Sequence, residues 1–142
     1  RAAGFNVRRS YYLALLADVR GRAGQPEAGQ SAIAEALAFA EESGERWWEA
    51  ELHRLQGELL LAQSTEHRAE AEACLSQALE IAQRQSAKAF ELRAATSLAR
   101  LGAERGERQK AHDLLASTYA WFTEGFDTAD LKDAKALLDE LR

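Results

Sequence analysis

Apolar residues recur along this chain at intervals of three and four positions, the spacing of one face of an α-helix. Clear stripes are Trp48, Leu52, Leu55, Leu59 and, near the end, Leu131, Ala134, Leu138, Leu141. Short segments rich in Gly, Ser, Gln and Glu interrupt the stripes at regular intervals and read as turns. The pattern predicts seven helices, at about residues 8–21, 26–42, 46–62, 67–84, 87–104, 108–122 and 128–141.

The predicted helices form a repeat in which each unit contains two helices. Shifting the sequence by 42 residues places Ile33 on Leu75, Leu37 on Leu79 and Trp48 on Phe90. In the helix at 26–42, Ile33, Leu37 and Ala40 form one apolar stripe, while Phe39 lies roughly opposite part of it. A helix with two apolar sides needs neighbours on both, as in a solenoid of stacked helical hairpins.

Small and large residues are placed within these helices as in a known repeat family. First helices contain Leu16-Ala17, Gln56-Gly57 and Leu98-Ala99; second helices contain Gly29/Ile33/Ala36, Ala71/Leu75/Ala78 and Ala111/Leu115/Thr118. The chain thus resembles tetratricopeptide (TPR) repeats, although their usual period is about 34 residues. The resemblance implies one all-α domain over residues 1–142, a right-handed TPR-like solenoid. It would have three helical hairpins (about 8–42, 46–84 and 87–122) and a capping helix at about 128–141. Trp121, Phe122 and Phe126 are expected to help close the end of the stack.

Residues 47–141 carry a more specific resemblance, through the strings WWEAELHRLQGELLLA, AEACLSQALEIAQRQSAKAFELRAATSLARL and WFTEGFDTADLKDAKALLDEL. They look like the C-terminal repeats of bacterial multidomain signalling proteins, which carry a signal-transduction ATPase domain and often an adenylate or guanylate cyclase domain. The resemblance implies a protein-protein interaction or regulatory scaffold module. The chain begins at Arg1 and contains no Met, so we expect a segment of a longer protein whose cyclase or ATPase activity lies in other domains.

Composition and charge limit the fold class, the kinds of partner and the location that we expect for this chain. The chain has 30 Ala and 20 Leu but only four Val and Ile in total, which excludes a β-rich fold. Residues 1–22 carry a charge of +4 and the remaining residues −9, so we expect no nucleic-acid partner. No apolar run could span a membrane. A single cysteine, Cys74, and the absence of a signal-peptide pattern favour a cytoplasmic location.

The sequence offers little for catalysis. Gly21, Gly24 and Gly29 are not followed by the Lys-Ser or Lys-Thr of a phosphate-binding loop. His53, His67 and His112 fall in three different helices without ligand spacing, and Cys74 has no local partner that would activate it. We therefore expect no catalytic residue, metal or cofactor in this segment, and a role other than that of an enzyme.

First helices line the concave groove of TPR proteins, so the resemblance implies a partner-binding face on those helices. The expected residues are Tyr11, Asp18, Trp47, Glu51, Arg54, Glu58, Arg93 and Arg100. The partner would be a protein, a peptide or a neighbouring domain of the same chain. An alternative is an oligomerisation or spacer segment, with self-association through Phe5, Val7, Tyr11 and Tyr12 of the first hairpin.

Overall fold

The structure is a computed structural model, and it describes residues 24–44 and 48–142. Every regular element in these ranges is helical, which confirms the all-α prediction. The expected helix at 8–21 lies outside the described residues. The elements are α2 (Pro26–Ser43), α3 (Glu49–Gln63), the 3-10 helix η1 (Thr65–His67), α4 (Arg68–Arg84), α5 (Lys88–Glu104), α6 (Arg108–Tyr119) and α7 (Ala129–Leu141).

Local signals explain the limits of α2. Pro26 lies in its first turn, where the missing amide hydrogen costs no helical hydrogen bond. Gly44 follows its last residue with a φ of 76°, the left-handed conformation that ends many helices and that glycine adopts without strain. The predicted span of 26–42 is therefore confirmed to within one residue.

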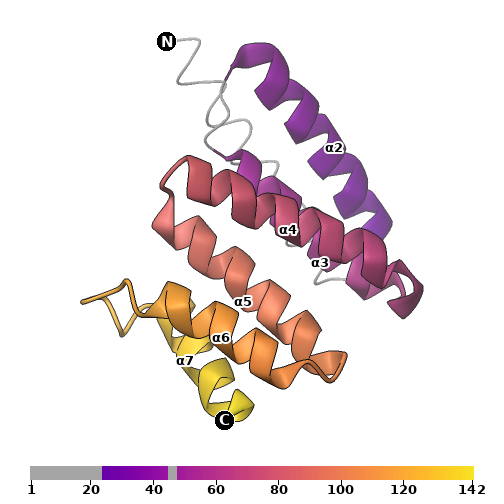
Figure 1. Ribbon diagram of the computed structural model, residues 1–142. Helices are drawn as coiled ribbons and strands as arrows, with labels where there is room; N and C mark the ends of the chain where they lie inside the picture. The colour runs from indigo at the N-terminus through magenta and orange to yellow at the C-terminus, as the bar shows by residue number, and fades with distance from the viewer. Residues whose placement is uncertain (1–23, 45–47) are drawn as a thin grey trace.

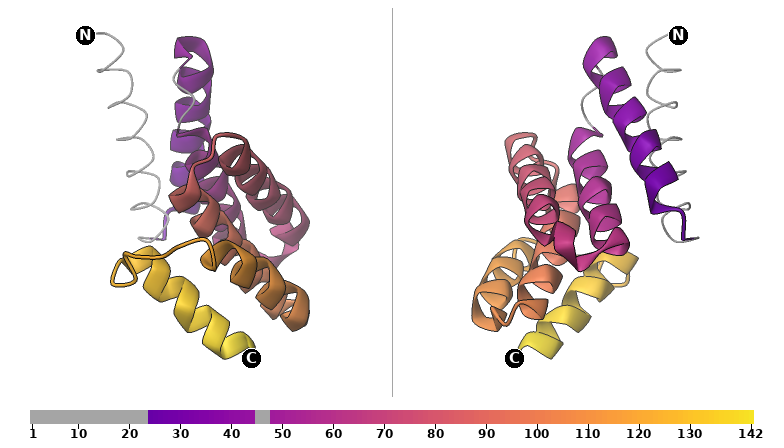
Figure 2. Two further views of the ribbon diagram at one scale, coloured as in Figure 1. Left: turned by 60° about the vertical axis from the view of Figure 1, so that its left-hand side comes forward. Right: turned by 90° about the vertical axis from the view of Figure 1, so that its right-hand side faces the viewer.

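The helices follow one another in chain order from α2 at one end of the molecule to α7 at the other (Figure 1, Figure 2). Short turns join most of them, so consecutive helices reverse direction and pack against each other. Helix α3 also contacts α5, and α5 contacts α7. Among the described elements, α2, α4 and α6 make no such contacts with one another. The alternate helices α3, α5 and α7 therefore lie side by side, and α2, α4 and α6 are spread apart.

The small and large residues of the repeat pattern occupy the interior. Gly29, Ala71, Ala111 and Thr118 are buried, as are the repeat-equivalent pairs Ile33/Leu75 and Ala36/Ala78. Leu115, which takes the same place in α6, is also fully buried. The positions of the second helices that carry the pattern of small and large residues therefore face the interior.

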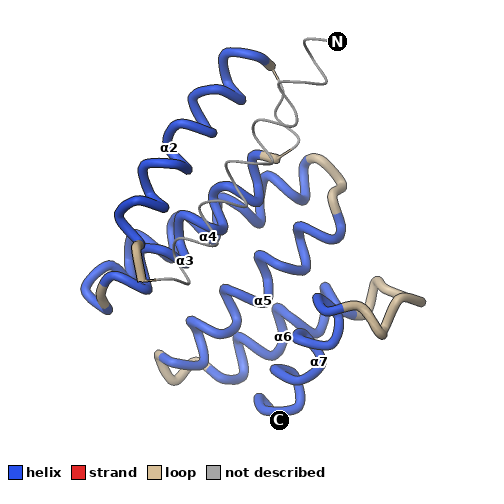
Figure 3. Tube along the Cα trace, turned by 180° about the vertical axis from the view of Figure 1, so that it is seen from behind, coloured by secondary structure: helices blue, strands red, loops and turns tan. Residues whose placement is uncertain are grey.

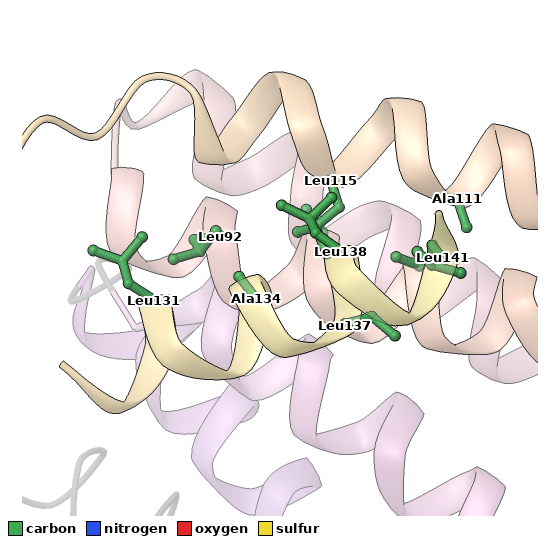
Figure 4. Packing of buried hydrophobic residues seen from close by; sticks show 10 residues of the cluster. Leu92, Ala111, Leu115, Leu131, Ala134, Leu137, Leu138 and Leu141 are labelled. Atoms are coloured by element: carbon green, nitrogen blue, oxygen red, sulfur yellow. The ribbon is translucent and has the colours of Figure 1, made fainter. Parts of the chain in front are cut away.

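The C-terminal core is built by α7 against α5 and α6. Leu131, Ala134, Leu138 and Leu141 are all buried, as the stripe predicts, and Leu137 joins them. Figure 4 shows the side chains of α7 directed toward Leu92 of α5 and toward Ala111 and Leu115 of α6. This stripe therefore buries apolar side chains of both preceding helices.

The connection from α6 to α7 differs from expectation. Helix α6 ends at Tyr119, short of 122, because the amides of Trp121 and Phe122 bond to carbonyls only three residues back, which tightens and ends the helix. The loop that follows projects from the helices (Figure 3). Phe122 packs against the core, but Trp121 is 58% exposed and Phe126 45% exposed. Trp121 and Phe126, which were expected to help close the end of the stack, are therefore largely exposed to solvent.

Candidate functional site

The predicted partner-binding residues fall into three groups. Glu51, Arg54 and Arg93 meet in one ion network, while Glu58 and Arg100 line a pocket further along the same helices. Tyr11, Asp18 and Trp47 lie outside the described residues. Helices α3 and α5 supply the described members, so the site is the face on which these helices and α7 lie side by side.

The ion network is centred on the Glu51 carboxylate, which is only 7% exposed. Arg54 donates to it through two nitrogens, from Nε to Oε1 at 2.9 Å and from Nη2 to Oε2 at 2.8 Å. Arg93 of α5 donates from Nη1 to Oε2 at 2.9 Å, and its Nε donates to Asp130 Oδ2 of α7 at 2.8 Å. Two guanidinium groups and two carboxylates thus connect α3, α5 and α7.

Arg93 is the member that joins all three helices. Burial acts to lower the pKa of its guanidinium, but the neighbouring Glu51 and Asp130 carboxylates outweigh that effect, so the pKa is raised. The guanidinium carbon also lies 5.9 Å from the centre of the Phe90 ring, within cation–π range. These contacts with Glu51, Asp130 and Phe90 orient the Arg93 side chain.

Sequence reasoning missed Asp130. It sits in the first turn of α7, where a carboxylate is favoured by the helix dipole, and it is the acceptor that extends the network to the last helix. A 42-residue shift relates Glu51 to Arg93, and the contact between them spans that interval. Arg93 and Asp130 are separated by 37 residues, so the repeat period could not have indicated their pairing.

The pocket lies where the second halves of α3 and α5 meet the start of α4. It has a volume of about 290 Å³, and its polar lining comprises Glu58, Arg68, Ser97, Arg100 and Glu104. Glu58 and Arg100 were predicted and the other three were not. Arg68 belongs to a second helix, so a prediction restricted to first helices could not include it.

Aromatic residues gather beside the ion network, at the start of α3 and α5. The rings of Trp48 and Phe90, which are equivalent in the repeat, are 5.3 Å apart and tilted by 39°. Trp48 was predicted as a core residue and is half-buried. The Lys88 ammonium lies 5.2 Å from the centre of the Trp121 ring and 3.2 Å from Glu91 Oε1, so it connects the exposed loop to α5.

The imidazole of His53 in α3 is largely buried. Burial lowers the pKa of its imidazole, against a smaller opposing effect of Glu49, and its Nδ1 atom is buried without a hydrogen-bond partner. The unfolded chain therefore binds the proton more readily than the folded chain, so acid favours unfolding. We expect stability to fall as pH drops from about 7 to about 5, and to fall less in His53→Gln. Urea titrations at several pH values measure this, and superimposable pH profiles would contradict it.

Other chemistry on the described residues is limited. Burial, with a smaller contribution from Glu70, raises the pKa of the Cys74 thiol, which disfavours the nucleophilic thiolate. Across residues 24–44 and 48–142, no three His, Cys, Asp or Glu side chains are grouped as metal ligands would be. None of the described helices has both the length and the apolar character needed to cross a membrane.

The chain is similar in sequence to part of a longer protein. It is 38% identical over 91 residues to an uncharacterized protein of Rhizobium meliloti (strain 1021). No family model matches the chain, and no solved structure matches it significantly. The 91 residues make up 64% of this chain but 9% of the relative, so the similarity is to a small segment of a much longer protein.

Proposed function

We propose that this segment is a non-enzymatic, TPR-like right-handed solenoid that acts as a scaffold. It binds a protein, a peptide or a neighbouring domain of its own chain through the face formed by α3, α5 and α7. The contact pattern supports this reading, because first helices that touch while second helices spread apart produce a curved stack with an inner face.

One observation carries the proposal: charged residues at repeat-equivalent positions lie beside one another on that face. Glu51 and Arg93 are 42 residues apart in sequence, and their side chains are joined at 2.9 Å. Seven residues further along each helix, Glu58 and Arg100 line one pocket. A rigid surface with fixed charges loses little conformational entropy when a partner binds, which favours recognition.

The same proposal includes the kind of longer protein to which this segment belongs. The segment belongs to a bacterial, cytoplasmic, multidomain signalling protein, and any cyclase or ATPase activity resides in its other domains. The similarity to a short part of a long protein agrees with this arrangement. A neighbouring domain is then a natural occupant of the face, because a covalent link raises its effective concentration.

Site-specific photo-crosslinking in the parent protein tests the scaffold role. A photoreactive amino acid replaces Arg54 or Arg100 on the proposed face, or Gln77 or Lys110 on the exposed surfaces of α4 and α6. We expect the two positions on the face to give a defined cross-linked product, identified by mass spectrometry, and the two control positions to give none. Equal labelling from all four positions, or none from the face, would overturn the scaffold role and favour a spacer.

The exposed aromatic loop favours oligomerisation as the second candidate. Large exposed apolar side chains such as Trp121 and Phe126 tend to mark contact surfaces. If the loop mediates self-association, sedimentation should show a mass that rises with concentration in the parent chain and stays monomeric in Trp121→Ala. A monomer at every concentration would exclude this alternative. We expect Trp121→Ala to destabilise the fold by only about 1 kcal/mol, through the lost contacts with Phe122 and Lys88.

A further inference from the structure

The loop between α6 and α7, residues 120–128, presents large aromatic rings to solvent (Figure 3). In the described part of the chain, Trp121 and Phe126 are the large apolar side chains left exposed, at 58% and 45%. Neighbouring rings orient both of them: Trp121 lies 5.1 Å from Phe122 at 82°, and Phe126 lies 5.8 Å from Tyr119. Exposed apolar side chains that are grouped in this way mark a contact surface.

The same part of the chain is acidic. Residues 120–130 contain three carboxylates, those of Glu124, Asp127 and Asp130, and no basic side chain. Asp130 is paired with Arg93, whereas neither Glu124 nor Asp127 takes part in an ion pair with another described residue. Both carboxylates are exposed, so the loop attracts cationic groups and repels anionic ones.

The Trp121 ring already contacts one cation of this chain. The Lys88 ammonium lies 5.2 Å from the centre of the ring, within the range of a cation–π interaction, for which tryptophan is the best aromatic side chain. Glu91 Oε1 lies 3.2 Å from the same ammonium and balances its charge. Because more than half of Trp121 is exposed beside Lys88, the ring has surface left for a second cation.

Charge also argues against two other occupants of the loop. In a two-fold contact between copies of this chain, Glu124 and Asp127 of one copy would face the same carboxylates of the other. An anionic lipid surface would be repelled by the same two groups. A cationic segment of a different polypeptide meets neither obstacle.

Arginine is the cationic side chain that matches both features of the loop. Its planar guanidinium group stacks on aromatic faces, and its fork of donors binds a carboxylate through two hydrogen bonds. The lysine ammonium is a compact and strongly hydrated charge, so it gains less from an exposed ring.

We propose that the 120–128 loop binds an arginine side chain of the partner polypeptide, which stacks on Trp121 and pairs with Glu124 or Asp127. This assignment rests on the scaffold role proposed above and specifies the chemistry of the partner at one point. Lys88 begins α5, and α7 begins directly after the loop. The partner would therefore meet the loop at the end of the α3, α5 and α7 face where α5 and α7 begin.

A peptide titration tests the assignment. The blocked tripeptides acetyl-Ala-Arg-Ala-amide, acetyl-Ala-Lys-Ala-amide and acetyl-Ala-citrulline-Ala-amide are titrated into the 142-residue chain while NMR follows the indole N–H signals. Citrulline has the shape of arginine without its charge. The Trp121 signal is assigned by its loss in Trp121→Phe. We expect the arginine peptide to shift that signal and to bind at least about 10-fold more tightly than the citrulline peptide and about 3-fold more tightly than the lysine peptide.

Variants separate the loop from general charge effects. Trp121→Ala and the double variant Glu124→Gln/Asp127→Asn should each weaken binding of the arginine peptide by about 10-fold. The matched control Glu66→Gln/Glu80→Gln removes the same charge from exposed positions of η1 and α4, and it should leave binding unchanged. Circular dichroism checks folding. Glu124 and Asp127 are exposed, so their replacement keeps the test valid even if Trp121→Ala fails to fold.

Four results would overturn the assignment. The first two are equal binding of the arginine and citrulline peptides, and unchanged binding in Glu124→Gln/Asp127→Asn. The third is a Trp121 signal that shifts with protein concentration alone, which would indicate a second copy as the occupant. The fourth is cosedimentation with phosphatidylglycerol vesicles that Trp121→Ala abolishes, which would indicate a lipid surface.

The cross-links from the α3 and α5 face keep this test distinct from that of the scaffold role. If those cross-links form while the arginine peptide fails to bind, the scaffold role stands and the loop assignment is wrong. Selective binding of the arginine peptide without the cross-links would instead keep the loop chemistry and remove the scaffold role.

Discussion

Gly57→Leu is expected to destabilise the chain by about 3 kcal/mol or more, because α4 packs closely against α3 at this glycine. A β-carbon built on Gly57 would lie 2.9 Å from Leu75 Cγ and 3.1 Å from the Ala71 carbonyl oxygen. Leu75 is fully buried, so it has no free space into which it can move. Any side chain at position 57 therefore pushes the two helices apart.

Two glycine-to-alanine variants test this reasoning, because they should change the free energy of unfolding in opposite directions. Alanine favours a helix over glycine by about 1 kcal/mol, so Gly102→Ala, whose β-carbon would lie 3.4 Å from Ala111 Cβ, should stabilise the chain. Gly57→Ala gains the same helix propensity, but the clash with Leu75 outweighs that gain. We therefore expect the free energy of unfolding to fall by about 1 to 2 kcal/mol.

Thermal unfolding followed by circular dichroism measures both alanine variants, and the midpoint temperatures should shift in opposite directions by about 3 °C for each kcal/mol. If Gly57→Ala were as stable as Gly102→Ala, close packing of α3 on α4 would not be the reason for glycine at this position.

Most of the helical architecture could be predicted because its signals are local. Apolar residues at intervals of three and four, interrupted by turn residues, placed α2 to α7 close to their observed limits. The end of α6 could not be predicted in this way, because Trp121 and Phe122 are apolar and continue the pattern, whereas the backbone tightens after Tyr119. Apolar character alone also could not show that Trp121 is mostly exposed, because it cannot show that a loop projects into solvent.

The ion network could be predicted only in part. Equivalent positions of neighbouring repeats lie side by side, so the 42-residue period joins Glu51 to Arg93. The position of α7 depends on the length and path of the loop before it, which is not part of the repeat, and Asp130 was therefore missed. Arg68 was missed for another reason: its place in the lining of the pocket depends on how the start of α4 packs beside α3 and α5.

Glu51→Gln is expected to have the largest effect of any change in the ion network. The variant keeps the shape of the side chain but removes the charge that Arg54 and Arg93 share, leaving two half-buried cations close together. Breaking a buried ion pair costs about 3 to 5 kcal/mol, and the partial exposure of both arginines reduces this to about 2 kcal/mol. Arg93→Gln should cost about 1 kcal/mol, because Glu51 keeps Arg54 as a partner.

A double-mutant cycle determines whether the network acts as a unit. Once Glu51 is replaced by the neutral glutamine, Arg93 has lost its charged partner on α3, so adding Arg93→Gln should cost about 1 kcal/mol less than it does alone. Arg105→Gln, which breaks an exposed pair with Glu72 outside the network, is the control and should have a much smaller effect. Free energies of unfolding from urea titrations supply all the terms. Strictly additive losses would mean that Glu51 and Arg93 stabilise α3 and α5 independently, and that the network does not fix the position of one helix against the other.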